Sequence, residues 1–336
     1  MTPSAVGRPA ESAPRSLRRV VCAASFRRVV SSAPTVHDVP LRYRHISFLS
    51  DLGTRDELAG VCRAVIADLA PDVRITDLTH EVPHHDVRAG GLALARAVPY
   101  VPAGVILAVV DPGVGSARRA VAVEVADGAG VFVGPDNGLL AHAVAVAGGA
   151  GRAVELTDAQ YHLAAPSPTF AARDVFAPAA AHLCLGVDLL DLGIEVDPHT
   201  MLPGTVPIPR VQGDELVVEV LWVDHYGNVQ LNVDPDEIAD WGSSVSLRWD
   251  DVTRTAARVS SFAEIGSRVG LVVDGSGLLA VCLERRSAAE ELGLVAGTEL
   301  RLARLTDGPA GAPAAHDRDS DDAAGVTTSV HLTVRR

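Results

Sequence analysis

The chain has 336 residues, a formal net charge of −13, and 29 basic side chains that are all arginine, because the sequence contains no lysine. The absence of lysine excludes enzymes that form a Schiff base through their own lysine, P-loop nucleotide hydrolases and protein kinases. The acidic balance argues against a nucleic-acid partner and an anionic membrane surface, and no run of 18 apolar residues predicts a transmembrane helix. A small neutral or cationic substrate fits this charge better.

The cysteines lie far apart, within apolar runs, and form no Cys-x-x-Cys pair. This spacing predicts buried, reduced thiols and therefore a cytoplasmic protein. The four are Cys22, Cys62, Cys184 and Cys282.

Composition divides the chain into five segments. Residues 1–43 are rich in Ala, Ser, Arg and Pro and predict a disordered extension, and the polar, Gly- and Pro-containing residues 306–336 predict a disordered tail. Residues 44–201 predict an α/β domain, and residues 210–305 have the strand-and-turn pattern of a β domain. Between these domains, residues 202–209 contain three prolines and predict a linker.

Apolar strand patterns alternate with helical patterns in the α/β domain, which predicts a mostly parallel sheet flanked by helices. Thr54 and Glu57 have the spacing of a capping box, and Asp86 and Asp174 are candidate caps of later helices. The predicted strands cover 46–49, 73–76, 105–110, 120–125 and 131–133, and the predicted helices cover 58–69, 86–99, 139–146 and 174–185.

The second domain contains short strand patterns separated by Gly, Asp and Ser turns, with one small helix at 287–292. This texture predicts a compact β-barrel. The predicted strands cover 215–223, 229–233, 245–249, 256–259, 269–273, 278–283 and 299–303.

Aspartates follow three of the predicted strands of the α/β domain, namely Asp51, Asp77 and Asp111. Ligands of open α/β sheets bind outside the carboxyl ends of the strands. A single aspartate at such a position is usually a turn former or a cap, but three together indicate a site.

Asp111 is followed by a glycine turn and then by Arg118, whose guanidinium could keep the carboxylate ionised. A surface arginine at a strand edge explains the spacing equally well. Asn137, in the turn Gly-Pro-Asp-Asn-Gly, is either a ligand contact or a turn former.

His80, His84 and His85 form a cluster that suggests a metal-dependent hydrolase as one alternative. Pro83 interrupts the helix that a pair of ligands four residues apart would need, and no cysteine is near. A loop of solvated histidines is the interpretation that this spacing favours, so we predict no metal and no cofactor.

Asp224, Tyr226 and Asn228 lie between two strands of the β domain and combine a carboxylate, an aromatic face and an amide. Such a set suits a flat heterocycle that carries a charged group. A hairpin turn is the alternative, although it does not account for the aromatic ring.

Several segments, in this order, resemble one known family. They include SDLGTRDELAGVCRAVI, ITDLTHEV, VVDPGVGSARRAVAVE, VGPDNGLL, TFAARDVFAPAAAHL, VDHYGNVQLN and DGSGLLAVCLERRSAA, and they span residues 46–304. The sequence closely resembles S-adenosyl-L-methionine (SAM) hydrolases that form adenosine, also called SAM hydroxide adenosyltransferases. This family is related to the SAM-dependent fluorinase and chlorinase.

The resemblance implies a homotrimer, with the substrate between the N-terminal domain of one subunit and the C-terminal domain of the next. Water or hydroxide would attack C5′ of the ribose and release adenosine and L-methionine. Asp111 and Arg118 match two members of the family's set that activates water. The implied substrate-binding residues are Asp51, Asn137, Phe170, Arg173, Asp224, Tyr226, Asn228 and Ser276.

Within this set the resemblance suggests individual roles. Asp51 would hold the ribose hydroxyls, since a carboxylate accepts two hydrogen bonds from a diol. Asp224 would bind the methionine ammonium, Tyr226 and Asn228 would contact adenosine or methionine, and Ser276 would contact the amino-acid end.

The chain departs from the family at one position, because the family segment Phe-His-Gly-Arg-Asp reads Phe170-Ala171-Ala172-Arg173-Asp174. Loss of a general base typically lowers a rate by about two to four orders of magnitude. A protein that binds SAM or adenosine with weak catalysis is therefore the alternative function. A SAM-dependent halogenase is a third and less favoured one.

Overall fold

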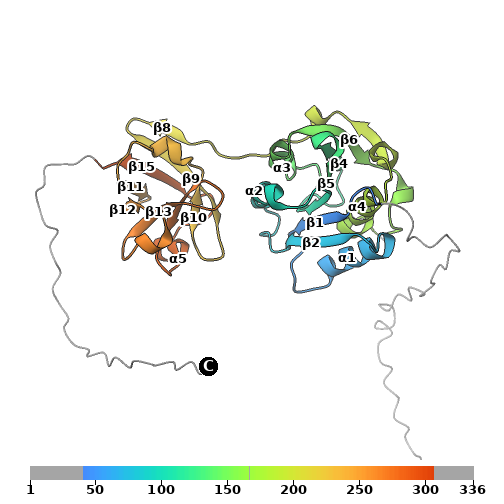
Figure 1. The fold of residues 1–336 in the computed structure, drawn as a ribbon, viewed down its shortest axis with the longest axis horizontal. Helices are drawn as coiled ribbons and strands as arrows, with labels where there is room; N and C mark the ends of the chain where they lie inside the picture. The colour runs from blue at the N-terminus through green and yellow to red at the C-terminus, as the bar shows by residue number, and fades with distance from the viewer. Residues whose placement is uncertain (1–40, 166, 306–336) are drawn as a thin grey trace, which may run out of the picture.

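The computed structural model describes residues 41–165 and 167–305, which form two folded domains (Figure 1). The predicted extension, up to residue 40, and the predicted tail at 306–336 lie outside the described residues. Tyr43, at the end of the predicted extension, is buried, and its hydroxyl donates to the carbonyl oxygen of Gly128 at 2.9 Å.

The N-terminal domain contains a seven-stranded sheet in the order β2-β1-β3-β5-β4-β6-β7. Strands β2, β1, β3 and β5 pair in parallel with one another, whereas the β5–β4, β4–β6 and β6–β7 pairs are antiparallel. The strands are β1 (His45–Ser50), β2 (Arg74–Thr79), β3 (Val105–Val109), β4 (Ala120–Val125), β5 (Gly130–Pro135), β6 (Ala150–Leu156) and β7 (Gly193–Val196).

The predicted α/β sheet is confirmed, and its pairing is mixed. The antiparallel half begins where β4 turns directly into β5 through Ala126–Gly128, three residues with positive φ. A connection this short permits only an antiparallel pair. The sequence analysis missed β6 and β7, whose outer residues are exposed and break the apolar pattern.

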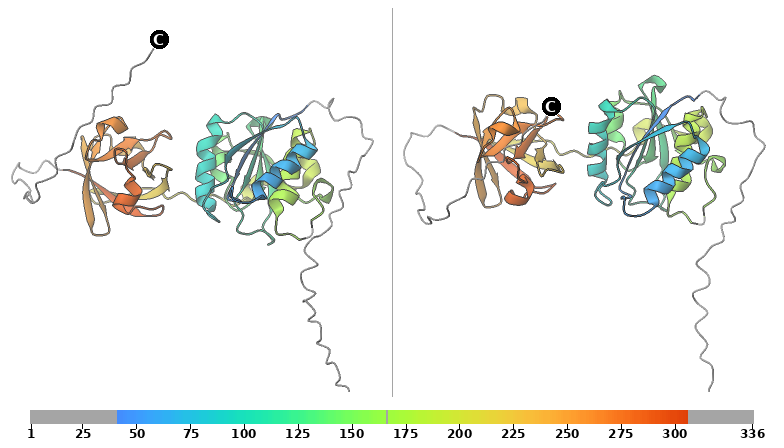
Figure 2. Two further views of the ribbon diagram at one scale, coloured as in Figure 1. Left: turned by 90° about the horizontal axis from the view of Figure 1, so that it is seen from below. Right: turned by 60° about the horizontal axis from the view of Figure 1, so that its bottom comes forward.

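Helices cover both faces of this sheet (Figure 2). Side chains of alternating strand residues point to opposite faces, so Phe48 packs with α1 and α4 while Leu49 packs with α2 and α3. This explains why the apolar run in β3 is continuous. The helices are α1 (Leu58–Leu69), α2 (Val87–Ala97), α3 (Ala141–Val146) and α4 (Ala177–Cys184), and a π-helical turn, η6 (Ala172–Phe176), leads into α4.

One of the predicted helix caps is confirmed and two are wrong. The side chain of Asp86 accepts from the Ala89 N–H at 2.8 Å at the start of α2. No capping box begins α1, because the Thr54 hydroxyl donates instead to Glu81, at 2.5 Å. Asp174 lies inside η6, where its carboxylate is bound by a neighbouring arginine.

The C-terminal domain is a barrel closed by seven strands, in the order β10-β14-β13-β12-β11-β15-β9, with a β9–β10 pairing that completes the ring. The predicted barrel is therefore confirmed, and its apolar interior includes Val218, Leu247 and Leu302. The elements are β8 (Arg210–Gln212), β9 (Glu215–Val223), β10 (Val229–Leu231), β11 (Ser244–Trp249), β12 (Val252–Arg258), β13 (Val269–Val273), β14 (Leu279–Cys282), α5 (Ala288–Leu292) and β15 (Glu299–Arg304).

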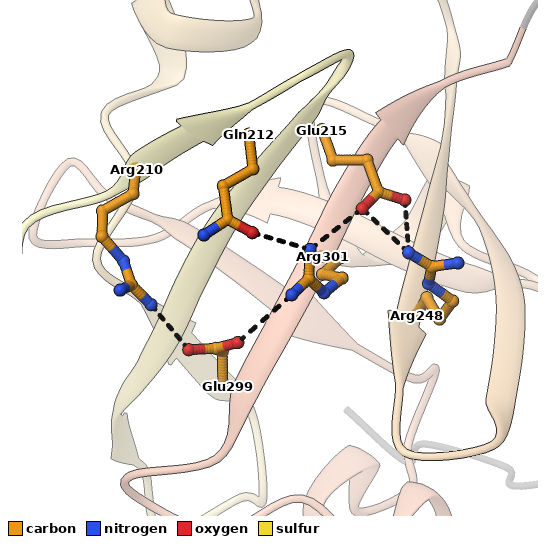
Figure 3. Close-up of polar contacts among 6 residues, drawn as sticks. All are labelled: Arg210, Gln212, Glu215, Arg248, Glu299 and Arg301. Carbon is orange, nitrogen blue, oxygen red and sulfur yellow. Dashed lines mark hydrogen bonds and ion pairs between the residues drawn. The ribbon is translucent and has the colours of Figure 1, made fainter.

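A polar network covers the outer wall of the barrel, where β8 adds to β9 (Figure 3). Glu215 accepts from Arg248 at 2.6 Å and from Arg301 at 3.2 Å, and Glu299 accepts from Arg210 at 2.8 Å. Because these pairs are largely exposed, each contributes at most about 1 kcal/mol to stability.

The two domains are joined by residues 202–209, which have no regular secondary structure. Helix α2 lies toward the barrel in Figure 1, and Arg88 pairs with Glu219 of β9 at 2.6 Å. Within the described part of the chain, no helix is both long and apolar enough to span a bilayer.

Candidate functional site

The carboxyl ends of β1 and β3 place two of the predicted aspartates side by side. Ser50 is in register with Val109, and the Asp51 N–H donates to the Val109 carbonyl at 3.3 Å, so Asp51 and Asp111 lie at one edge of the sheet. The prediction that Asp77 follows its strand is wrong. Asp77 lies within β2, because this strand continues to Thr79, and it pairs with Arg63 at 2.9 Å.

Asp111 and Arg118 form a bidentate ion pair. The Arg118 Nε donates to Asp111 Oδ1 at 2.7 Å, and its Nη2 donates to Oδ2. Only 6% of the Asp111 side chain and 14% of the Arg118 side chain are exposed. The guanidinium also lies 5.1 Å from the Phe176 ring, so packing and charge both fix its position.

A hollow of about 600 Å³ lies beside this pair and includes Arg118, His162, Ala171 and Asp174 in its lining. Asp174 is itself held by an arginine, since Arg173 donates to its two carboxylate oxygens at 2.6 and 2.9 Å.

Arg173 also stacks at 5.0 Å over Phe170, which packs against the core. Phe170 and Arg173 therefore support the wall of the hollow.

The histidine cluster shapes the loops around Asp51. His80 is buried, with its Nδ1 2.8 Å from the Ser50 hydroxyl, so the prediction of a solvated side chain is wrong for this residue. The His85 N–H donates to Asp51 Oδ2 at 3.0 Å, and His84 Nδ1 lies 3.2 Å from the Asp51 carbonyl. Among residues 41–165 and 167–305, no three His, Cys, Asp or Glu side chains form a group that could hold a metal ion.

Asn137 uses both ends of its amide within the chain. Its Nδ2 donates to the Val110 carbonyl at 2.9 Å, and its Oδ1 accepts from the Leu139 N–H at 3.1 Å. The side chain thus ties the end of β5 to the end of β3, and helps to fix the edge at which Asp111 lies.

Two loops of the barrel are built around aspartates in the same way. Asp224 accepts from the N–H groups of Tyr226 and Asn228, at 2.9 and 2.8 Å. Asp274 accepts from the N–H groups of Ser276 and Leu278, at 2.8 and 3.2 Å. These bonds hold the loops in shape and keep two carboxylates close to neighbouring hollows.

Asn228 lines two hollows, one in the barrel and one where Arg96 of α2 meets the barrel. One, of about 500 Å³, also contains Tyr226, of which 79% is exposed. The other, of about 220 Å³, also contains Asp224 and Ser276. The sequence analysis missed several lining residues that come from distant strands and loops, among them Trp222, Phe262, Asp274, Arg285 and Arg286.

The described cysteines do not supply a nucleophile. Cys62, Cys184 and Cys282 are buried and free, and burial raises the pKa of each thiol to about 12. These thiols therefore stay protonated near neutral pH.

Comparison with known proteins assigns both domains. The N-terminal domain model of the SAM hydroxide adenosyltransferases matches residues 46–193, and the C-terminal domain model matches residues 218–301. The chain belongs to the SAM hydroxide adenosyltransferase family. This confirms the resemblance drawn from the sequence motifs.

Several named proteins and one solved structure are similar to this chain. A protein of Salinispora tropica named (R)-S-adenosyl-L-methionine hydrolase is 46% identical over 258 residues, which cover 76% of this chain and 97% of the relative. A protein of the same name from Thermus thermophilus is 40% identical, over 77% of this chain and 99% of the relative. A fluorinase of an Actinoplanes species is 26% identical, over 77% of this chain and 97% of the relative. The structure also resembles the crystal structure of a conserved protein from Thermotoga maritima, with a TM-score of 0.71 and 32% sequence identity. The match covers 77% of this chain and all of the Thermotoga chain.

In this member of the SAM hydroxide adenosyltransferase family, the candidate residues occupy two separate surfaces of one chain. The hollow beside Arg118 is lined only by N-terminal residues, including those of η6, whereas Tyr226 and Asn228 line a hollow of the barrel, and the smaller hollow at Asn228 adds only Arg96 of α2 to its barrel residues. In Figure 1, α4, which continues η6, lies on the side of the N-terminal domain remote from the barrel, and α2 lies on the near side. The structure of one chain therefore does not bring the two sets together.

Proposed function

We propose that the protein hydrolyses SAM to adenosine and L-methionine. The observation that carries this proposal is the buried Asp111–Arg118 pair beside an open hollow, in a chain 46% identical to a protein named (R)-S-adenosyl-L-methionine hydrolase. The acidic net charge of −13 also suits a sulfonium cation.

The chemistry of SAM matches the groups on the two surfaces. The second carboxylate oxygen of Asp51 can accept from a ribose hydroxyl while Oδ2 keeps its bond to the His85 N–H. The exposed ring of Tyr226 suits the flat adenine, and the guanidinium groups of Arg285 and Arg286 suit the methionine carboxylate.

The ammonium end of methionine needs a different set of groups. The carboxylate of Asp224 carries the opposite charge and lies in the same hollow as Ser276 and Asn228, whose polar atoms can complete the contacts.

The reaction makes few demands on the protein. Water attacks C5′ of the ribose, and the sulfonium leaves as a neutral thioether, so no acid is needed to protonate a leaving group. The protein must hold the water, C5′ and sulfur in line and restrict hydration of the nucleophile. The rigid Asp111–Arg118 pair is suited to orient that water.

A complete site under this proposal needs two copies of the chain. The N-terminal surface of one copy would meet the barrel surface of another, in the homotrimer that the family resemblance implies. The separation of the two surfaces on one chain supports this arrangement. The buried, free thiols support a cytoplasmic location.

Chromatography of the pure protein incubated with SAM, with and without chloride, tests the function. Hydrolysis predicts adenosine and methionine in equal amounts under both conditions. Tight binding of unchanged SAM would instead support the binding protein that Ala171 suggests. A 5′-chlorinated nucleoside formed only with chloride would support the halogenase, a function to which the 26% identical fluorinase gives some weight.

A further inference from the structure

Two carboxylates near the hollow beside Arg118 already bind arginine side chains, that of Asp174 in its lining and that of Asp111 through Arg118 itself. Asp111 is held by two hydrogen bonds from Arg118, and Asp174 by two from Arg173. Both oxygens of each carboxylate are therefore occupied by hydrogen bonds from a guanidinium. Water attack at C5′ releases a proton, so the site needs another acceptor.

His162 is the one imidazole among the described residues that line this hollow. It follows the short turn η5 (Ala159–Tyr161), and its backbone N–H donates to the Ala159 carbonyl at 3.2 Å. The next residue, Leu163, donates its N–H to the Asp174 carbonyl at 2.9 Å. These bonds fix the segment that carries His162 against η6, and His162 and Arg118 both line the hollow.

The surroundings of His162 favour the neutral imidazole. Burial lowers its pKa, and the negative charge of Asp158 acts in the opposite direction. From the other elements around the hollow, Arg118 contributes a positive charge and Asp174 a negative one that is paired with Arg173. A neutral imidazole at pH 7 is the form that accepts a proton.

We propose that His162 is a catalytic residue, the general base that takes the proton from the attacking water. This inference rests on the proposed function. As the water oxygen forms its bond to C5′, the C5′–S bond breaks and its electron pair goes to sulfur, which becomes the thioether of methionine. One water proton moves to a ring nitrogen of His162 and later to solvent, and the other stays on the 5′-hydroxyl of adenosine.

The test compares H162A and H162Q with the wild type and with H199A, which removes an exposed histidine outside the described hollows. Each variant is assayed for kcat and KM with SAM from pH 5 to 9, and its fold is checked by circular dichroism and thermal melting. We expect kcat of H162A and H162Q to fall about 100- to 1,000-fold, the range for loss of a general base, with KM within about twofold. In the wild type, kcat falls in acid as the imidazole gains a proton, at a pH below the ordinary histidine pKa because burial lowers the pKa of His162, and this decline disappears in both variants.

A double variant separates catalysis from folding. The side chain of Ala171 lines the same hollow, so H162A/A171H returns an imidazole to it from η6. We expect at least about tenfold recovery of kcat over H162A, which a purely structural loss would not show.

Three results would overturn the inference. In the first, the wild type is active and H162A and H162Q have the same kcat and pH profile as H199A. This result leaves the proposed function intact. The second is loss of activity together with a lower melting temperature in both variants and no recovery in H162A/A171H. The third is a wild type that leaves SAM unchanged, which overturns the proposed function and this inference together.

Discussion

At the scale of single residues, the proposed site combines groups that are rigidly held with groups that are open to solvent. Asp111 and Arg118 are almost fully buried and bind one another, whereas Tyr226 projects from the barrel with most of its ring exposed. Rigid, buried pairs orient reacting groups, and exposed aromatic rings become covered only when a ligand arrives. These two kinds of residue therefore respond differently to substitution.

Asp111→Asn should lower both stability and turnover. The substitution leaves the buried Arg118 guanidinium without its counter-charge, which costs about 3 kcal/mol of unfolding free energy. It also releases the guanidinium from its fixed position, so we expect kcat to fall about 100-fold. Urea denaturation and the SAM assay measure the two effects.

Arg210→Gln is the matched control for Asp111→Asn. Arg210 and Glu299 form a 2.8 Å pair, but their side chains are 61% and 51% exposed, so the unfolding free energy should change by less than about 1 kcal/mol. Equal stability losses in the two variants would contradict the structural role given to the Asp111–Arg118 pair.

Tyr226→Ala should weaken SAM binding without destabilising the fold. The ring is exposed in the free chain, so its removal costs little core packing. Under the proposed function the adenine loses the exposed ring on which it stacks, and we expect KM to rise about tenfold. Tyr100→Ala removes a ring that is 83% exposed and outside the described hollows, and should leave KM unchanged. The same KM for the two variants would remove Tyr226 from the site.

At the scale of elements, tight loops at strand ends set the positions of the polar groups. The sequence predicted the buried strands well, because residues 105–110 and 120–125 are apolar on both faces or flanked by clear turns. It missed β6 and β7, which lie toward the antiparallel edge and expose many residues. It predicted helix α1 but was wrong about its capping box, because the Thr54 hydroxyl binds Glu81 instead.

Gly227→Ala tests the loop that carries Tyr226 and Asn228. Gly227 has a φ of +82°, and an added Cβ would lie 2.1 Å from the Ser287 hydroxyl oxygen. Both backbone strain and collision oppose the substitution, so we expect a loss of about 2 to 3 kcal/mol in unfolding free energy and a higher KM.

Gly277→Ala provides the comparison for Gly227→Ala. Gly277 has a similar φ of +85°, but nothing lies within 4 Å of an added Cβ. Only the strain of the positive φ remains, and the loss should be about 1 kcal/mol. Equal losses in the two variants would mean that contact with Ser287 does not matter.

At the scale of the whole molecule, the two domains present complementary sets of groups on separate surfaces. Sequence motifs single out Asp51, Asp111 and Asp224 as candidates, because a carboxylate after a strand is visible in the local pattern. They did not identify Phe262 or Arg285, which reach the barrel hollow only through long-range strand pairing. No local sequence pattern encodes contacts between residues so far apart in the chain. The same holds for His162 and Ala171, which line one hollow.

Complementation between inactive variants tests whether the site is shared between copies. Asp111→Asn damages the N-terminal surface, and Asn228→Ala damages the barrel surface. If each site combines one surface from each of two subunits, co-expression of the two variants restores activity to about a quarter of the sites by random mixing. Activity no higher than that of the separate variants would place the complete site within one chain.

The most direct test of the central claim is the reaction with SAM in water enriched in ¹⁸O, with both products analysed by mass spectrometry. The account predicts adenosine that carries one ¹⁸O at its 5′-hydroxyl and an equal amount of unlabelled methionine, because water attacks C5′ and sulfur leaves with methionine. Unchanged SAM, or adenosine without the label, would contradict it.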